Sequence, residues 1–139
     1  MSAADAKPEG FGLAEIGQIA VPVRDLERAV AFYRDTLGMC FLFQAPPGLA
    51  FFDCAGVRLM LERAAPHAEC HSSVLYFRVG DIRVAYETLT ARGVAFQDAP
   101  HVVHKAPDHE LWMSFFRDGE NNLLALMSEV PSASSRAGG

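Results

Sequence analysis

One unit of the sequence occurs twice, and this repeat constrains the fold more than any other feature. Residues 16–38 read as a β-branched apolar strand, a turn, an amphipathic helix and a glycine stop, and residues 74–93 repeat that order. A repeat of this length corresponds to one supersecondary unit, so we predict two similar modules. The matched pairs, each 56 positions apart (79 − 23, for example), are Val23 and Val79, Asp25 and Asp81, Leu26 and Ile82, Ala29 and Ala85, and Tyr33 and Leu89.

Each copy carries the start and stop signals of one helix. Its aspartate stands at the N-cap position, where a side-chain oxygen accepts an unpaired backbone N–H. Gly38 and Gly93 follow the apolar stripes, where a left-handed C-terminal residue is needed. The spacing predicts helices over residues 26–37 and 82–92.

Three short strands are predicted after each helix, which gives β-α-β-β-β twice and an α+β fold. In the first module, residues 16–62, we expect strands at 39–44, 49–54 and 57–62. In the second module, residues 73–128, we expect strands at 94–98, 110–117 and 122–128, a loop at 99–108 and a turn at 118–121.

Bulk properties exclude several classes of function. The chain has 139 residues, enough for one domain, which we place at 13–129 between a flexible arm (1–12) and a flexible tail (130–139). The net charge is −5 without a basic cluster, which argues against nucleic acid and anionic membranes as partners. No apolar run approaches the ~20 residues of a membrane span, and the first residues do not read as a signal peptide. With an odd number of cysteines, three, in no metal-binding spacing, we expect a cytoplasmic protein.

Three segments carry a resemblance to a known family: AVPVRDLERAVAFYRDTLGM, FRVGDIRVAYETLTARGV and FFRDGENNLLAL. They resemble the glyoxalase, bleomycin-resistance and extradiol-dioxygenase superfamily, the vicinal oxygen chelate fold. The resemblance implies two modules paired into a curved cleft of mixed sheets, often completed by dimerisation. It also implies a small-molecule ligand, because members include isomerases, lyases, dioxygenases, thiol transferases and drug-sequestering binders.

Metal-dependent members of that family place four ligands in the cleft, one on the first and one on the last strand of each module. By this resemblance, the four positions fall on Gln18, Met60, Val74 and Ala125. Only Gln18 among them offers a donor suited to a hard divalent ion. We therefore expect no metal cofactor, and a divalent metal stays as the alternative if a neighbour such as Glu62 is recruited.

Two groups of residues remain as site candidates. Gln18, Met60, Glu62, Tyr76 and Trp112 are expected to line the cleft as ligand-binding residues, although Gln18 and Met60 also suit plain packing. His104 and His109 are the catalytic candidates, because imidazole exchanges protons near neutral pH. A solvated polar loop explains these histidines equally well.

Two hypotheses of function follow, and a third is a purely structural dimerisation module. The first is a homodimeric binder of a small, partly apolar or aromatic molecule that lacks the four-ligand metal site. The second is a glyoxalase- or dioxygenase-like enzyme, a lyase, isomerase or oxygenase, that uses an atypical metal or histidine site. The missing metal donors favour the binder, and the histidine-rich loop favours the enzyme.

Overall fold

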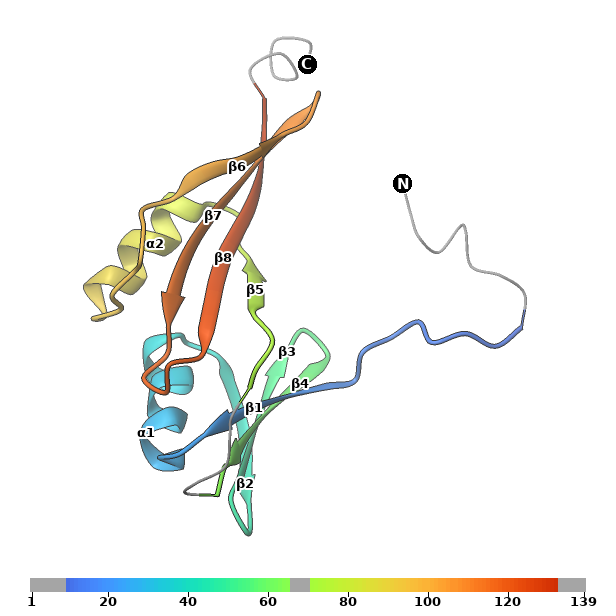
Figure 1. Cartoon of the computed structure of the whole chain (residues 1–139), viewed down its shortest axis with the longest axis vertical. Coiled ribbons are helices and arrows are strands. Elements are labelled where there is room, and N and C mark those ends of the chain that lie inside the picture. Colours follow the sequence, from blue (N-terminus) through green and yellow to red (C-terminus); the bar gives the residue numbers. More distant parts are fainter. Residues whose placement is uncertain (1–9, 66–70, 133–139) are drawn as a thin grey trace.

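The computed structural model describes residues 10–65 and 71–132 and contains the predicted repeat of two βαβββ modules (Figure 1). The elements of the first module are β1 (Gln18–Val23), α1 (Leu26–Ala31), the π-helix η2 (Phe32–Thr36), β2 (Cys40–Ala45), β3 (Leu49–Cys54) and β4 (Val57–Arg63). Those of the second are β5 (Leu75–Arg78), α2 (Ile82–Ala91), β6 (His101–Lys105), β7 (His109–Arg117) and β8 (Leu123–Pro131). The predicted α+β class is confirmed.

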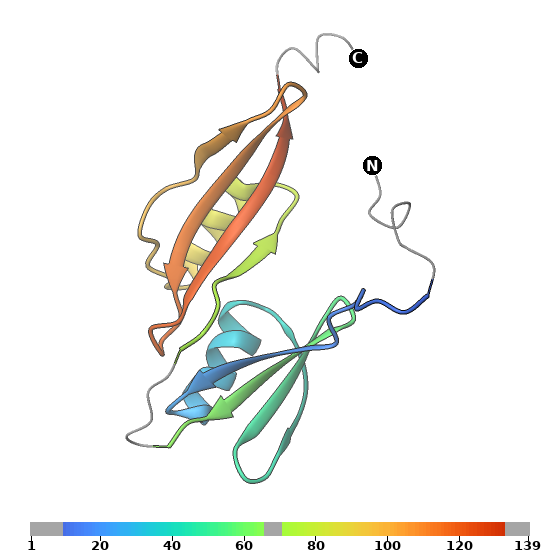
Figure 2. The same cartoon turned by 45° about the vertical axis from the view of Figure 1, so that its right-hand side comes forward.

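Both sheets are mixed and have equivalent strand orders. The first has the order β1-β4-β3-β2 and the second β5-β8-β7-β6, with the outer first strand parallel to the last strand of its module. Both helices lie to the left of their sheets in Figure 1 and behind them in Figure 2. We call the side of each sheet that carries the helix its helix face, and the other side its open face.

The predicted helix signals are confirmed in both modules. Asp25 accepts a hydrogen bond from the backbone N–H of Arg28 at 3.1 Å. Asp81 accepts two, from residues 83 and 84, each at 3.1 Å. Gly38 has φ +74° and Gly93 has φ +97°, the left-handed conformation that costs glycine no steric penalty.

The prediction of one continuous α-helix over residues 26–37 is wrong beyond Ala31. There the chain continues as a π-helix, closed by a 2.9 Å hydrogen bond from Leu37 N–H to the Phe32 carbonyl. The Tyr33 side chain is completely buried, and its hydroxyl donates to Asp118 of the second module at 2.7 Å. We attribute the wider turn to this contact, since tertiary packing overrides the local preference for an α-helix.

The second module departs from prediction at its third element. Residues 101–105 form strand β6, where we expected a loop, and the expected strand 94–98 is reduced to an isolated bridge between Phe96 and Phe116. β6 is an edge strand, so its polar side chains remain in solvent, and the flanking prolines fall outside its ladder. Because β7 begins at His109, its partner β8 extends to Pro131, into the predicted tail.

The ends of the chain are only partly described. Residues 10–17 extend away from both modules (Figure 1), and the Phe11 and Leu13 side chains are exposed. Residues 1–9 of the predicted arm and 133–139 of the predicted tail lie outside the described part of the chain.

The β7–β8 turn joins the two modules. The Glu120 carboxylate accepts the backbone N–H groups of Arg24 at 2.7 Å and Asp25 at 2.9 Å. The Asn122 amide donates to the Pro22 carbonyl at 3.0 Å. These contacts satisfy donors just before α1, and they fix the first helix against the second module.

Candidate functional site

The open face of the first sheet brings together three of the predicted ligand-binding residues. Strand register pairs Ala20 with Met60 and Pro22 with Glu62, so Gln18, Met60 and Glu62 share this face. The Gln18 amide nitrogen lies 3.7 Å from the Met60 sulfur. These three side chains therefore lie on one side of the first sheet.

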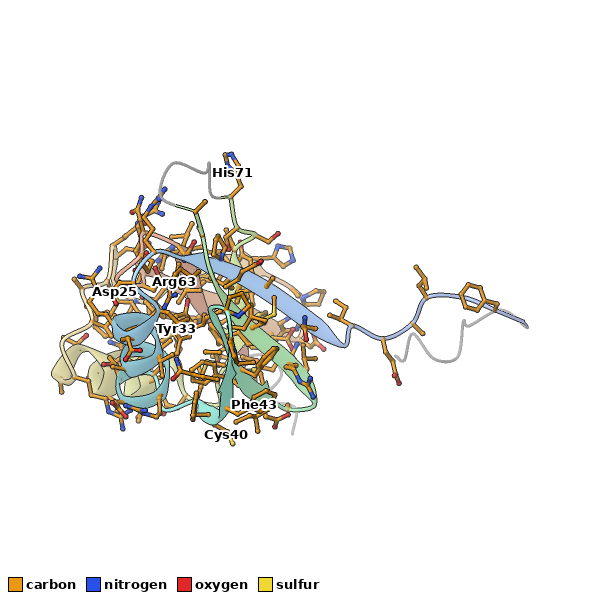
Figure 3. All side chains as sticks on the ribbon, turned by 90° about the horizontal axis from the view of Figure 1, so that it is seen from below. Asp25, Tyr33, Cys40, Phe43, Arg63 and His71 are labelled. Atoms are coloured by element: carbon orange, nitrogen blue, oxygen red, sulfur yellow. The ribbon has the colours of Figure 1, made fainter. Side chains whose placement is uncertain are left out.

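An aromatic pair and a cation lie beside these residues. The rings of Phe43 and Phe51 have centroids 4.8 Å apart, and the Arg58 guanidinium lies 5.5 Å from the Phe51 centroid. Phe51 is only 8% exposed, whereas Phe43 is 46% exposed. Figure 3 shows Phe43 on the side of the sheet away from Asp25 and Tyr33 of the first helix. This arrangement presents the exposed ring of Phe43 to a ligand, beside a positive charge that lies over the Phe51 ring.

The open face of the second sheet has a similar aromatic pair. The rings of Tyr76 and Phe115 meet edge to face with centroids 6.0 Å apart. Both flank Ala125 in the strand register, and Ala125 is completely buried. Tyr76 is 48% exposed, so its ring is available to a ligand.

Both catalytic candidates lie at the far end of the second sheet. His104 pairs with Leu111, and His109 is two residues from Leu111 on the same strand, so both imidazoles belong to the open face. The His109 Nδ1 atom lies 2.8 Å from the Asp108 carboxylate. This hydrogen bond holds the pKa of Asp108 below its usual range.

Trp112 lies on the helix face, opposite to Tyr76, and not on the concave side where we expected it. It packs against the hydrophobic core, and its indole N–H donates to Glu110 at 3.2 Å. Sequence reasoning also missed Arg58 as a member of the first open face. Its position two residues before Met60 in β4 is the signal that identifies it.

The four positions equivalent to metal ligands do not suit a hard divalent ion. Gln18 and Met60 lie side by side, but Val74 and Ala125 supply no donor atom. Among residues 10–65 and 71–132, no group of three or more His, Cys, Asp or Glu side chains could hold a metal ion. Glu62, the predicted substitute donor, pairs in register with Pro22 and not with another carboxylate or imidazole.

Comparison with known proteins decides the family. The profile of the Glyoxalase/Bleomycin resistance protein/Dioxygenase superfamily matches residues 15–126. The chain belongs to this superfamily. The resemblance carried by the repeated segments is thus confirmed.

Several known proteins are similar to this chain over most of their length. The uncharacterized protein YraH of Bacillus subtilis (strain 168) is 27% identical, over 78% of this chain and 94% of that protein. TnmS3, an antibiotic binding protein from Streptomyces sp. CB03234, is 27% identical with a TM-score of 0.70, over 88% of this chain and 100% of TnmS3. A lactoylglutathione lyase from Agrobacterium tumefaciens is 22% identical with a TM-score of 0.66, over 85% of this chain and 96% of the lyase, and shows the shared fold.

No helix in the described residues is long and apolar enough to cross a membrane.

Proposed function

We propose that the chain is a binding protein for a small, partly apolar or aromatic molecule, held on the open faces of its sheets without a four-ligand metal site. The observation that carries this proposal is the pair of aromatic clusters, Phe43 with Phe51 and Tyr76 with Phe115, in each of which the first ring is nearly half exposed. An apolar surface with few polar groups is typical of small-molecule sites. The likeness to the antibiotic binding protein TnmS3 supports a binding role.

In this proposal, polar and polarisable side chains beside the aromatic rings orient the ligand. Gln18 presents an amide, Met60 a polarisable sulfur and Glu62 a carboxylate on the same face. Arg58 adds a positive charge next to the aromatic pair. A planar ligand that stacks on Phe43 and carries a polar substituent suits a face with this mixture of side chains.

The proposal includes a homodimer. Each sheet is covered by a helix on one side only, and apolar side chains such as Phe43, Tyr76 and Leu42 are more than 40% exposed. A second copy that brings its own open face against the first would exclude water from a ligand between them. Light scattering tests this part, and a monomer at tens of micromolar, roughly above common dimer affinities, would count against it.

Calorimetric titration with anthraquinone-2-sulfonate, a planar aromatic probe, tests the binding site. Phe43→Ala and Tyr76→Ala should weaken the affinity about tenfold or more, because aromatic side chains that a partner covers on binding contribute most of the binding energy. Val84→Ala is the matched control, since Val84 is exposed on α2 and on the other side of the sheet. Equal affinity in all three variants would refute an open-face site.

A parallel titration tests the absence of the usual metal centre. Zinc, nickel, manganese and iron are added separately, followed by desalting and metal analysis. Stoichiometric retention that is lost in Gln18→Ala would refute the metal-independent binder.

The second candidate function is an enzyme, and the Asp108–His109 pair favours it. With Nδ1 bound to the carboxylate, the Nε2 atom of His109 remains on the open face as a proton acceptor or donor. The likeness to a lactoylglutathione lyase suggests assaying formation and cleavage of lactoylglutathione. Turnover that is abolished in His109→Gln would favour the enzyme, and turnover that survives it would remove the histidine-based mechanism.

A further inference from the structure

An apolar cavity of about 280 Å³ lies in the helix layer between the two modules. One wall is α2, which contributes Ala85 and Leu89, and the floor is the helix face of the second sheet. The opposite wall comes from the first module, where Met39 follows the first helix. A molecule in this cavity would therefore contact both modules.

This cavity is separate from the open faces. Phe77 lines it, whereas its neighbour Tyr76 belongs to the open face, because successive residues of a strand point to opposite sides. The same alternation separates Leu126, which lines the cavity, from Ala125. The second sheet therefore lies between the cavity and the open-face site.

The chemistry of the lining selects an apolar body with one negative charge. Thr88 and Arg92 are the polar members of an otherwise apolar lining, which contains no acidic side chain. Arg92 extends across from the end of α2 and donates from Nη1 to the Thr36 carbonyl at 3.0 Å. Within the described residues no carboxylate forms an ion pair with Arg92. A guanidinium has five N–H donors, so Arg92 can also bind an anion.

The volume limits the size of the ligand. Sites for drug-sized molecules enclose roughly 300–1,000 Å³, so a cavity just below that range takes something smaller. We propose that this cavity is a second binding site, specific for a small monocarboxylate with an apolar body of the size of octanoate. The carboxylate binds Arg92, and the apolar body packs against Leu89, Phe77 and Met39.

Methyl NMR with ¹³C-labelled methionine locates the ligand directly. Met39 lines the cavity, whereas Met60, Met113 and Met127 belong to the open faces by strand register. Octanoate should shift the Met39 resonance saturably and leave the resonances of Met60, Met113 and Met127 unchanged. Shifts confined to the open-face methionines, or no shift at all, would overturn the proposal. Because the methionine methyl groups report on the cavity and on the open faces separately, this result does not depend on whether the open-face site binds a ligand.

Variants test the charge and the location. Arg92→Gln should weaken octanoate binding about tenfold or more, since a charge-assisted hydrogen bond is lost. Arg83→Gln, at the other end of α2, is the matched control and should bind as the unmodified chain does. Octanamide, which lacks the charge, should bind the unmodified chain about tenfold more weakly than octanoate. Equal affinity for octanoate and octanamide, or an unaffected Arg92→Gln variant, would overturn the carboxylate specificity.

Filling the cavity provides the last arm of the test. Ala85→Leu places extra methyl groups inside it, and unchanged Met60, Met113 and Met127 resonances would show that the variant remains folded. Octanoate should then no longer shift Met39. Retained binding in this folded variant would overturn the assignment of the site.

Discussion

Tyr33 and Leu89 occupy the same position of the repeat, yet the space around the two side chains differs. Tyr33 is completely buried, its ring lies 6.0 Å from Phe52, and its hydroxyl binds Asp118. Leu89 lines a cavity together with Phe116, the residue that corresponds to Phe52. Tyr33 lines a smaller pocket of about 150 Å³ beside Asp118, so the smaller side chain at the equivalent position goes with the larger pocket, although the backbone plan is shared.

The last hairpin turns of the two modules also differ, in their length and in the surroundings of their aspartates. The β3–β4 turn is short, with Ala55 and Gly56 at φ +53° and +91°, and Asp53 accepts a hydrogen bond from Gly56 of its own turn. The β7–β8 turn is longer, and its Asp118 is buried between the modules. The longer β7–β8 turn of the second module therefore reaches the first module and is hydrogen-bonded to it.

The largest effect is expected from Asp118→Ala. This carboxylate accepts hydrogen bonds from the Tyr33 hydroxyl, from the Asn122 amide group and from two backbone N–H groups of its turn. Its removal leaves buried donors unpaired and should lower the free energy of unfolding by about 3 kcal/mol or more. Asp53→Ala, in the exposed turn, should cost less than about 1 kcal/mol. Urea unfolding measures both, and similar losses would contradict the proposed difference between the turns.

Tyr33→Phe should cost about 1–2 kcal/mol at neutral pH, because it removes one buried hydrogen bond. Burial, and secondarily the Asp118 charge, raise the pKa of the Tyr33 phenol above its ordinary value of 10.0. The folded state therefore holds this proton more tightly than the unfolded chain does, so the contribution is complete below pH 10 and declines above it.

Stability should fall by up to about 1.4 kcal/mol per pH unit from this group in alkali. Tyr33→Phe should lose that part of the slope, as measured by urea unfolding between pH 9 and 11, roughly the range around the ordinary pKa of tyrosine. An identical alkaline slope in the variant would show that Tyr33 does not cause it.

The two N-caps should differ slightly. Asp81→Ala and Asp25→Ala are each expected to cost about 1 kcal/mol. Asp81→Ala should cost more, because the Asp81 carboxylate accepts hydrogen bonds from two backbone N–H groups of α2, whereas Asp25 accepts one from α1. Asn in either position restores a cap and serves as the control. A larger loss of unfolding free energy in Asp25→Ala would contradict this order and indicate that the contact with Glu120 decides the effect.

The smallest effect is expected from Leu89→Phe. The added ring enters the cavity, so the free energy of unfolding should change by less than about 1 kcal/mol. Leu61→Phe, at a completely buried position of the first module, should cost about 1–3 kcal/mol through overpacking. Thermal unfolding measures both. Equal losses would mean that the space beside Leu89 is not available, and octanoate binding should disappear in Leu89→Phe.

Much of the candidate site was accessible from the sequence. The family resemblance predicted Gln18 and Met60 in one cleft, and alternation placed Glu62 on the face of Met60; the strand register puts all three on one side of the first sheet. Tyr76 lies on the second sheet. Trp112 was expected on the open face but lies on the helix face. Alternation along a strand shows which residues share a face, but it does not show which of the two faces a helix will cover. The face of β7 that meets α2 is decided by packing with residues such as Ile82, which is distant in the chain.

The sequence by itself determined the repeat, the helix caps, the glycine stops and most strands, because these depend on residues within a few positions of one another. Only the tertiary structure decided the π-turn at Tyr33, the strand at His101–Lys105 and the cavity beside Leu89. Tyr33 and Asp118 are 85 residues apart, so no local pattern encodes their contact. Edge position likewise decides whether a polar segment forms a strand, and the shape of an interior depends on how side chains from both modules pack together.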